Sequence, residues 1–181
     1  MTGPVRCGWV SSAPEYIAYH DEEWGRPVEG DDRVFERLTL EAFQSGLSWI
    51  TILRKRENFR SAFAGFSIPA VAAFGQDDVD RLLADPGIVR NRAKIEAAVS
   101  NARAALGVGL SDLVWRHADP GAPAPASGAD VPALTPGSVA LAKELKQNGF
   151  RFVGPTTAYA LMQAIGLVND HVADCWVRGR I

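Results

Sequence analysis

The chain has 181 residues, of which 47% are hydrophobic and 22% are charged, and its formal net charge is −2. A chain of this length buries enough surface to fold without disulfides, and its composition excludes a disordered or membrane-spanning protein. Neither a signal peptide nor an apolar run of membrane-span length is present, so we expect a cytoplasmic protein that does not engage a membrane. The charge is uneven, because residues 54–60 (RKRENFR) and 90–94 (RNRAK) are locally basic. Such segments either contact phosphates or form solvated helix faces.

Apolar residues recur at helical spacing in the first half of the chain. Residues 31–46 predict an amphipathic helix that starts at two aspartates and stops at a glycine, and residues 47–66 predict a second one. Within residues 77–106 we expect two helices separated by a tight Pro-Gly turn.

The second half contains a proline-rich stretch at residues 118–137, which predicts a surface loop, followed by helices at 138–149 and 154–166. No strand alternation of useful length and no internal repeat occurs. We therefore predict an all-α fold in which residues 1–181 form a single domain of two helical lobes.

The two cysteines and two of the three histidines form pairs near the chain ends, Cys7 with His20 and His171 with Cys175. A spacing of four would place His171 and Cys175 on one face of a helix, and two sulfur and two nitrogen ligands suit tetrahedral zinc. The alternative is a buried cysteine and a surface histidine at each end. If all four residues meet, no coordination position stays open for water, so the metal is structural.

Residues 77–106 also have the pattern of a helix-hairpin-helix motif. Gly87 lies in the turn, and Arg90, Arg92 and Lys94 stand at the start of the second helix. Backbone N–H groups at such a turn and helix start bind phosphate, which positions DNA without reading its sequence. The alternative is a plain helical hairpin with no ligand.

Taken together, these features resemble the DNA-3-methyladenine glycosylase I family of bacterial repair enzymes. The resemblance runs from residue 6 to about residue 175. It is carried by the segments RCGWV, YIAYHDEEWG, GLSWITIL, KREN, GIVRNRAKI, NAR, GFRFVG and MQAIGLVNDHV.

The resemblance implies a helix-hairpin-helix glycosylase fold without an iron–sulfur cluster, and one structural zinc ion held by Cys7, His20, His171 and Cys175. It also implies the activity. A monomeric enzyme would flip N3-methyladenine out of alkylated double-stranded DNA and hydrolyse its N-glycosidic bond. It would act monofunctionally, releasing free 3-methyladenine and leaving an abasic site.

A flipped cationic purine favours aromatic faces and a carboxylate that accepts a hydrogen bond from its amine. By resemblance, the carboxylate is Glu41 and the pocket is lined by Trp9, Tyr16, Tyr19 and Trp49, whereas we expect Trp24 to be a core residue. The alternatives are an aromatic core and a salt bridge from Glu41 to a nearby arginine.

The stretch SGLSW lies between two predicted helices and suits a wedge that opens the base stack. The resemblance suggests that Leu47 inserts into the duplex and that Gly46 lets the backbone approach it. On periodicity alone, Leu47 would be an ordinary core residue.

Three positions depart from the family pattern. Ala42 and Phe43 follow the predicted site glutamate where the family often has Gly-Gln, and Pro155 stands where it has threonine. Together with the lack of the aspartate that many helix-hairpin-helix glycosylases use, Phe43 motivates an alternative function. In that alternative the chain is a non-catalytic, zinc-stabilised module that binds DNA lesions.

Overall fold

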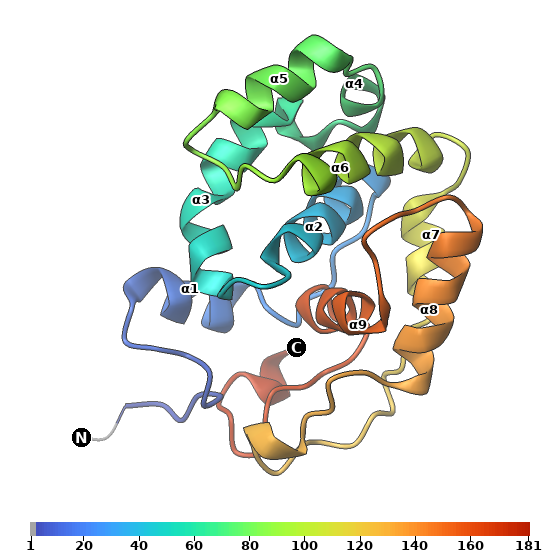
Figure 1. The fold of residues 1–181 in the computed structure, drawn as a ribbon. Helices are drawn as coiled ribbons and strands as arrows, with labels where there is room; N and C mark the ends of the chain where they lie inside the picture. Colours follow the sequence, from blue (N-terminus) through green and yellow to red (C-terminus); the bar gives the residue numbers. More distant parts are fainter. Residues whose placement is uncertain (1–2) are drawn as a thin grey trace.

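A computed structural model describes residues 3–181, and all regular secondary structure in this range is helical, as predicted (Figure 1). None of the helices in this range has the length and hydropathy to cross a bilayer. The α-helices are α1 (Pro14–Glu22), α2 (Asp31–Gln44), α3 (Trp49–Ala62), α4 (Ile68–Ala72), α5 (Gln76–Ala84), α6 (Arg92–Ala105), α7 (Leu110–Trp115), α8 (Pro136–Gln147) and α9 (Pro155–Ala164). Short 3₁₀ turns cover Ala64–Phe66, Gly128–Asp130 and Arg178–Arg180.

Helices α2, α3, α5, α6, α8 and α9 lie where the apolar periodicity predicts helices. The prediction missed α1, α4 and α7, which have only nine, five and six residues. Helices this short contain too few turns to show a periodic apolar face, and α1 and α4 depend on a proline in the first turn and on tertiary packing.

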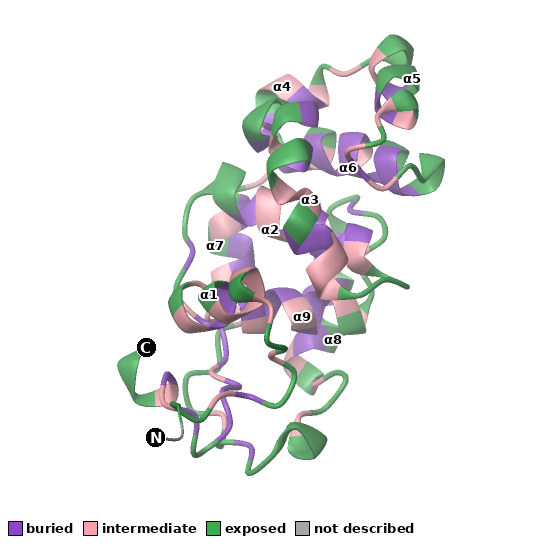
Figure 2. Ribbon diagram, turned by 90° about the vertical axis from the view of Figure 1, so that its left-hand side faces the viewer, coloured by how far each residue is buried: buried purple, intermediate pink, exposed green. Residues whose placement is uncertain are grey.

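Helices α4, α5 and α6 form one end of the molecule, and α7, α8 and α9 form the other end together with both chain termini (Figures 1 and 2). A single cluster of buried apolar side chains runs through both ends, from Val71 and Leu82 to Leu145 and Leu161. Helix α2 contacts α3, α6, α7 and α9, so it is the central element of this core. Because α2 is packed on several sides, the side chains that it carries are held in fixed positions.

The N- and C-terminal segments lie side by side (Figure 1). The Trp176 amide donates to the Val5 carbonyl at 3.0 Å, and the Ala173 amide donates to the Pro125 carbonyl in the proline-rich loop at 2.9 Å. His171 and Cys175 do not lie on a helix, because residues 171–175 form an irregular turn closed by a hydrogen bond from the Cys175 amide to the Val172 carbonyl. The turn still brings both side chains to the same place.

A close backbone crossing fixes this arrangement. Gly166 has φ +83°, and a Cβ atom there would lie 2.7 Å from the Gly25 carbonyl oxygen. Only glycine fits this approach. The crossing joins the segment after α9, which carries His171 and Cys175, to the segment that directly follows α1, the helix that carries His20.

Candidate active site and metal centre

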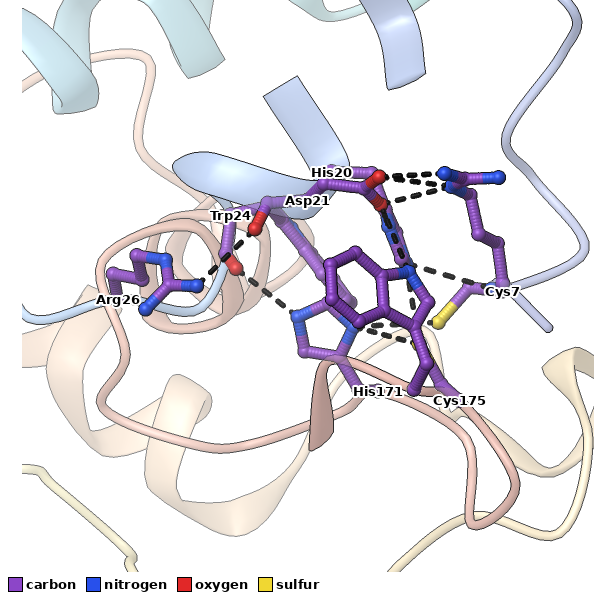
Figure 3. Close-up of polar contacts among 9 residues, drawn as sticks. Cys7, His20, Asp21, Trp24, Arg26, His171 and Cys175 are labelled. Atoms are coloured by element: carbon purple, nitrogen blue, oxygen red, sulfur yellow. Dashed lines mark hydrogen bonds and ion pairs between the residues drawn. The ribbon is translucent and has the colours of Figure 1, made fainter. Parts of the chain in front are cut away.

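The four predicted metal ligands meet in one buried cluster beside the chain termini (Figure 3). Each offers one ligand atom, and these atoms all lie within 4.8 Å of one another. Both cysteines are free thiols rather than a disulfide. This group could hold a metal ion.

The separations between donor atoms fit a tetrahedral ion. Cys175 Sγ lies 3.5 Å from His20 Nε2 and 3.4 Å from His171 Nδ1, and Cys7 Sγ lies 3.6 Å from His171 Nδ1. A tetrahedral ion bound at about 2.3 Å to sulfur and about 2.0 Å to nitrogen holds them about 3.5 Å apart. Burial lowers the pKa of His171 to about 4, so its imidazole is neutral, the form that binds metals.

Groups around the cluster orient both imidazoles (Figure 3). His20 Nδ1 lies 2.7 Å from Asp21 Oδ1, and His171 Nε2 lies 3.1 Å from the Trp24 carbonyl oxygen. Arg6 in turn donates to both oxygens of Asp21 at 2.7 to 3.0 Å. Such carboxylate and carbonyl partners fix the ring nitrogen that faces a metal.

A cavity of about 400 Å³ opens next to this cluster. All five residues predicted for base recognition line it, and Trp24, which we expected in the core, lines it as well. The walls come from four helices (α1, α2, α3 and α9), from the proline-rich loop and from the segments next to the predicted metal ligands. They consist of Cys7, Gly8, Trp9, Tyr16, Tyr19, Trp24, Glu41, Gln44, Trp49, Gly128, Val131, Ala160, Gln163, Asp170 and Val172.

Glu41 lines this cavity from the last turn of α2, the central helix of the core, and is only 6% exposed. Burial raises its pKa to about 8, against the opposing charge of Arg37 one turn earlier. Arg37 itself pairs with Glu23 at 3.3 Å, and Glu41 forms no salt bridge within residues 3–181. The salt-bridge alternative for Glu41 is therefore wrong, and its carboxyl group is available to a ligand.

Aromatic rings surround the carboxyl group. Tyr19 is 3% exposed with its ring centroid 5.4 Å from that of Trp49, and Trp9 lies 5.2 Å from Tyr16 and 5.0 Å from Trp24. The indole Nε1 of Trp49 is buried without a hydrogen-bond partner. An unpaired buried donor at a cavity wall suits a ligand that brings an acceptor.

Gly46 and Leu47 lie in the loop between α2 and α3. Gly46 has φ +81°, a conformation that favours glycine, and Leu47 is 38% exposed, so it is not the core residue that periodicity alone suggests. The Leu47 amide donates to the Gln44 carbonyl at 2.7 Å, and Gln44 Nε2 donates back to the Leu47 carbonyl at 2.6 Å. The loop is thus ordered and presents an apolar side chain to solvent.

Lys94 does not face outward as a phosphate contact, and that part of the prediction is wrong. Lys94 is only 9% exposed. Its Nζ donates hydrogen bonds to the carbonyl oxygens of Phe43 at 3.0 Å and Ser45 at 2.6 Å. The last carbonyls of α2 lack helical partners and carry partial negative charge, so they attract an ammonium group. Lys94 therefore braces the loop that carries Leu47.

The other hairpin residues lie in and after the turn at residues 85–91. The Gly87 amide donates a hydrogen bond to Asp85 Oδ1 at 2.7 Å. A residue other than glycine fits poorly at this position, because its Cβ atom would lie 2.9 Å from the same oxygen. Arg90 is exposed, and Arg92 pairs with Glu96 at 3.3 Å and Asp80 at 3.6 Å. Arg90 thus remains accessible to a ligand.

Several cavity residues are not among the predicted site residues, although Gln163 and Asp170 stand in the segment MQAIGLVNDHV that carries the family resemblance. Gln163 and Asp170 come from α9 and the segment after it, and Gly128 and Val131 come from the proline-rich loop. Only the fold brings them to the cavity. Phe43, in contrast, packs in the core against Phe59 at 4.9 Å and does not line the cavity, so its departure from the family pattern does not alter the pocket wall.

Comparison with known proteins agrees with this arrangement. Residues 9–178 match the family described as methyladenine glycosylase. The chain is 49% identical to DNA-3-methyladenine glycosylase 1 of Escherichia coli (strain K12), over 94% of this chain and 95% of that protein. It is 44% identical to DNA-3-methyladenine glycosylase of Haemophilus influenzae, over 94% and 96%.

Solved structures give the same result. A crystal structure of 3-methyladenine DNA glycosylase I superposes with a TM-score of 0.92 at 50% identity, covering 95% of this chain and 98% of that one. A variant of 3-methyladenine DNA glycosylase I in complex with 3-methyladenine superposes with a TM-score of 0.91 at 34% identity, covering 96% and 97%.

Proposed function

This chain belongs to the methyladenine glycosylase family, and we propose that it excises N3-methyladenine from alkylated double-stranded DNA. It is a DNA-3-methyladenine glycosylase, an N-glycosyl hydrolase, and free 3-methyladenine is its base product. Within the proposal the enzyme acts as a monomeric single domain, residues 1–181, in the cytoplasm.

Glu41 and the aromatic rings recognise the base in this proposal. N3-methyladenine in DNA is cationic, so it gains from the electron-rich faces of Trp9, Tyr16, Tyr19 and Trp49. Glu41 accepts a hydrogen bond from its exocyclic amine. A cationic base also favours the ionised form of Glu41, whose pKa burial raises to about 8, whereas neutral adenine gains neither the cation–π attraction nor the attraction to a carboxylate.

The chemical step needs little acid catalysis. The bond between N9 and C1′ breaks, and its electron pair moves to N9 and neutralises the cationic ring. Water forms the new bond to C1′ and loses a proton to solvent, which leaves an abasic site. The Lys94 ammonium is engaged with two carbonyl oxygens, which disfavours a Schiff base and supports monofunctional hydrolysis.

The loop between α2 and α3 opens the duplex in this proposal. Leu47 inserts into the base stack, and Gly46 permits close approach of the backbone. The hairpin of α5 and α6 forms a helix-hairpin-helix motif in which the backbone near Gly87 and the side chains of Arg90 and Arg92 contact phosphates. Extrusion of the base costs a few kcal/mol, and least for a damaged one.

We propose that the buried cluster of Cys7, His20, His171 and Cys175 binds one structural zinc ion. The donor separations and the neutral imidazoles support this assignment. When bound, zinc would be closed to water and would supply no chemistry to the reaction. The four side chains would instead fix the segments that carry Trp9 and Tyr16.

The observation that carries the proposal is the buried Glu41 carboxyl group amid aromatic rings in a cavity of the size that takes a small ligand. Metal-loaded protein should release 3-methyladenine from methylated duplex DNA, as detected by chromatography of the free base. Glu41→Gln and Trp49→Ala should reduce this release. Salt-dependent binding of methylated DNA without base release would instead favour the non-catalytic lesion-binding module.

A further inference from the structure

A second carboxylate lines the same cavity as Glu41. Asp170 lies in the segment between α9 and the metal-ligand turn, and its residue is only 6% exposed. No lysine, arginine or histidine within residues 3–181 forms a salt bridge with it. The reaction described above makes no use of this group.

Both hydrogen bonds to Asp170 reach the same oxygen. Tyr159 Oη donates to Oδ2 at 2.5 Å, and Gln163 Nε2 donates to Oδ2 at 2.9 Å. The two donors lie one turn apart on α9. Within residues 3–181 the other oxygen, Oδ1, accepts no hydrogen bond, yet it is not among the fully buried side-chain atoms that lack a partner. Oδ1 is thus free to accept a hydrogen bond from a ligand in the cavity that Asp170 lines.

A buried carboxylate without a cation is unfavourable, and two hydrogen bonds offset only part of that cost. A positively charged ligand in the cavity offsets the rest of this free-energy cost, because Coulomb attraction is strong away from bulk water. A neutral ligand of the same shape brings no such gain. Two acidic side chains, Glu41 on α2 and Asp170 in the segment after α9, therefore favour a cationic ligand in the cavity.

We infer that Asp170 is a specificity-determining residue that selects cationic alkylated bases over neutral bases by its charge. This inference rests on the proposed function and deepens it, since Glu41 is no longer the sole acidic group that recognises the lesion. The hydrogen bonds that tie Asp170 to α9 do not require the charge. An asparagine amide oxygen can accept both of them, so Asp170→Asn separates the two roles.

The test compares two small ligands of one shape. One is 3,9-dimethyladeninium, a permanent cation, and the other is 3-deaza-3,9-dimethyladenine, which has the same shape and is neutral in mildly alkaline buffer that keeps its basic N1 unprotonated. Calorimetry measures the affinity of metal-loaded protein for each. We expect Asp170→Asn to weaken binding of the cation about tenfold and binding of the neutral ligand less than twofold.

Asp174→Asn is the matched control, because Asp174 is exposed in the same segment and does not line the cavity. It should leave both affinities unchanged. Equal weakening of both ligands by Asp170→Asn, or no weakening of the cation, would overturn the inference. If the unsubstituted protein binds neither ligand, the proposed function itself fails.

Metal content and thermal unfolding will show whether Asp170→Asn folds. If it does not, Gln163→Lys places an ammonium group beside Asp170 and cancels its charge, whereas Gln163→Met only removes a hydrogen bond. We then expect the selective loss of cation binding with lysine but not with methionine. The same loss with both variants would contradict a role for the charge.

Discussion

The Lys94 ammonium donates a hydrogen bond to the Ser45 carbonyl at 2.6 Å, and this contact joins the first turn of α6 to the loop that carries Leu47. A second bond reaches the Phe43 carbonyl at 3.0 Å. A side chain that sequence alone assigns to phosphate binding therefore braces the loop that we propose as the wedge.

Lys94→Met should slow base release from DNA while leaving affinity for free 3-methyladenine unchanged. Hydrogen bonds from charged groups contribute about 1.5–3 kcal/mol, so a loss on the order of tenfold in single-turnover rate is expected. Arg103→Met is the control, since Arg103 bridges two carbonyls, those of Ala72 and Phe74, far from the cavity. It should lower stability without a specific loss of activity. An equal loss of free-base affinity in Lys94→Met would contradict the bracing role.

Leu47→Ala should also slow excision, because the exposed leucine no longer fills the space of the extruded base. We expect roughly a tenfold lower single-turnover rate and an unchanged melting temperature, since the side chain is 38% exposed and adds little to the core. Leu106→Ala removes a 60% exposed leucine after α6 and should affect neither property. Excision at the original rate by Leu47→Ala would rule out the wedge.

The ionisation of Glu41 should make the free energy of unfolding depend on pH. Its pKa of about 8 in the folded chain lies above the ordinary value, because burial disfavours the charged form. The folded state therefore binds more protons between about pH 4.5 and pH 8, and stability from this group falls as the pH rises through that window. Glu41→Gln should accordingly stabilise the protein at pH 8, on the order of 3 kcal/mol, and much less at pH 5.

Urea unfolding at the two pH values measures this difference, and titration of the metal ligands cancels between the variants. Glu23→Gln is a control of opposite sign. Although burial opposes it, hydrogen bonds from Arg56 lower the pKa of Glu23, so its removal should destabilise the protein at pH 8. An equal gain in the free energy of unfolding of Glu41→Gln at pH 5 and pH 8 would show that the pKa of Glu41 is not raised in the folded chain.

Removal of the metal should loosen the ends of the chain. Metal analysis of purified protein should find one zinc ion per chain, and a chelator should lower the melting temperature by about 10 °C or more, as expected for loss of several kcal/mol. Cys175→Ser should reproduce this effect without chelator. Metal-free protein of unchanged stability would contradict a structural metal site.

Long helices and their buried faces could be predicted from the sequence. The two aspartates in the first turn of α2 and the apolar spacing in α3 and α6 are local signals, and these helices bury the apolar faces that the spacing predicts. The short helices could not be predicted, because α4 and α7 are stabilised by contacts with the rest of the fold rather than by their own pattern.

The candidate site shows the same division. The resemblance predicts Glu41 and the aromatic residues as site residues. Asp170 and Gln163 stand in the segment MQAIGLVNDHV of the same resemblance, but only the path of the chain after α8 shows that they reach the cavity. Lys94 was misjudged because a lysine at a helix start is exposed in most sequences. Here the end of α2 lies directly against α6 and its carbonyls accept the ammonium protons.

The donor cluster between the termini gives the pocket two kinds of support. Glu41 and Trp49 stand on helices of the main apolar core, while Trp9 and Asp170 lie on segments that Cys7 and His171 anchor. If the cluster binds zinc as proposed, one wall depends on the burial of apolar side chains and the other on coordination by two cysteines and two histidines. Heat and urea would challenge the first wall, and oxidants or zinc starvation the second, so a repair enzyme that faces chemical stress would be vulnerable to that stress at one half of its pocket.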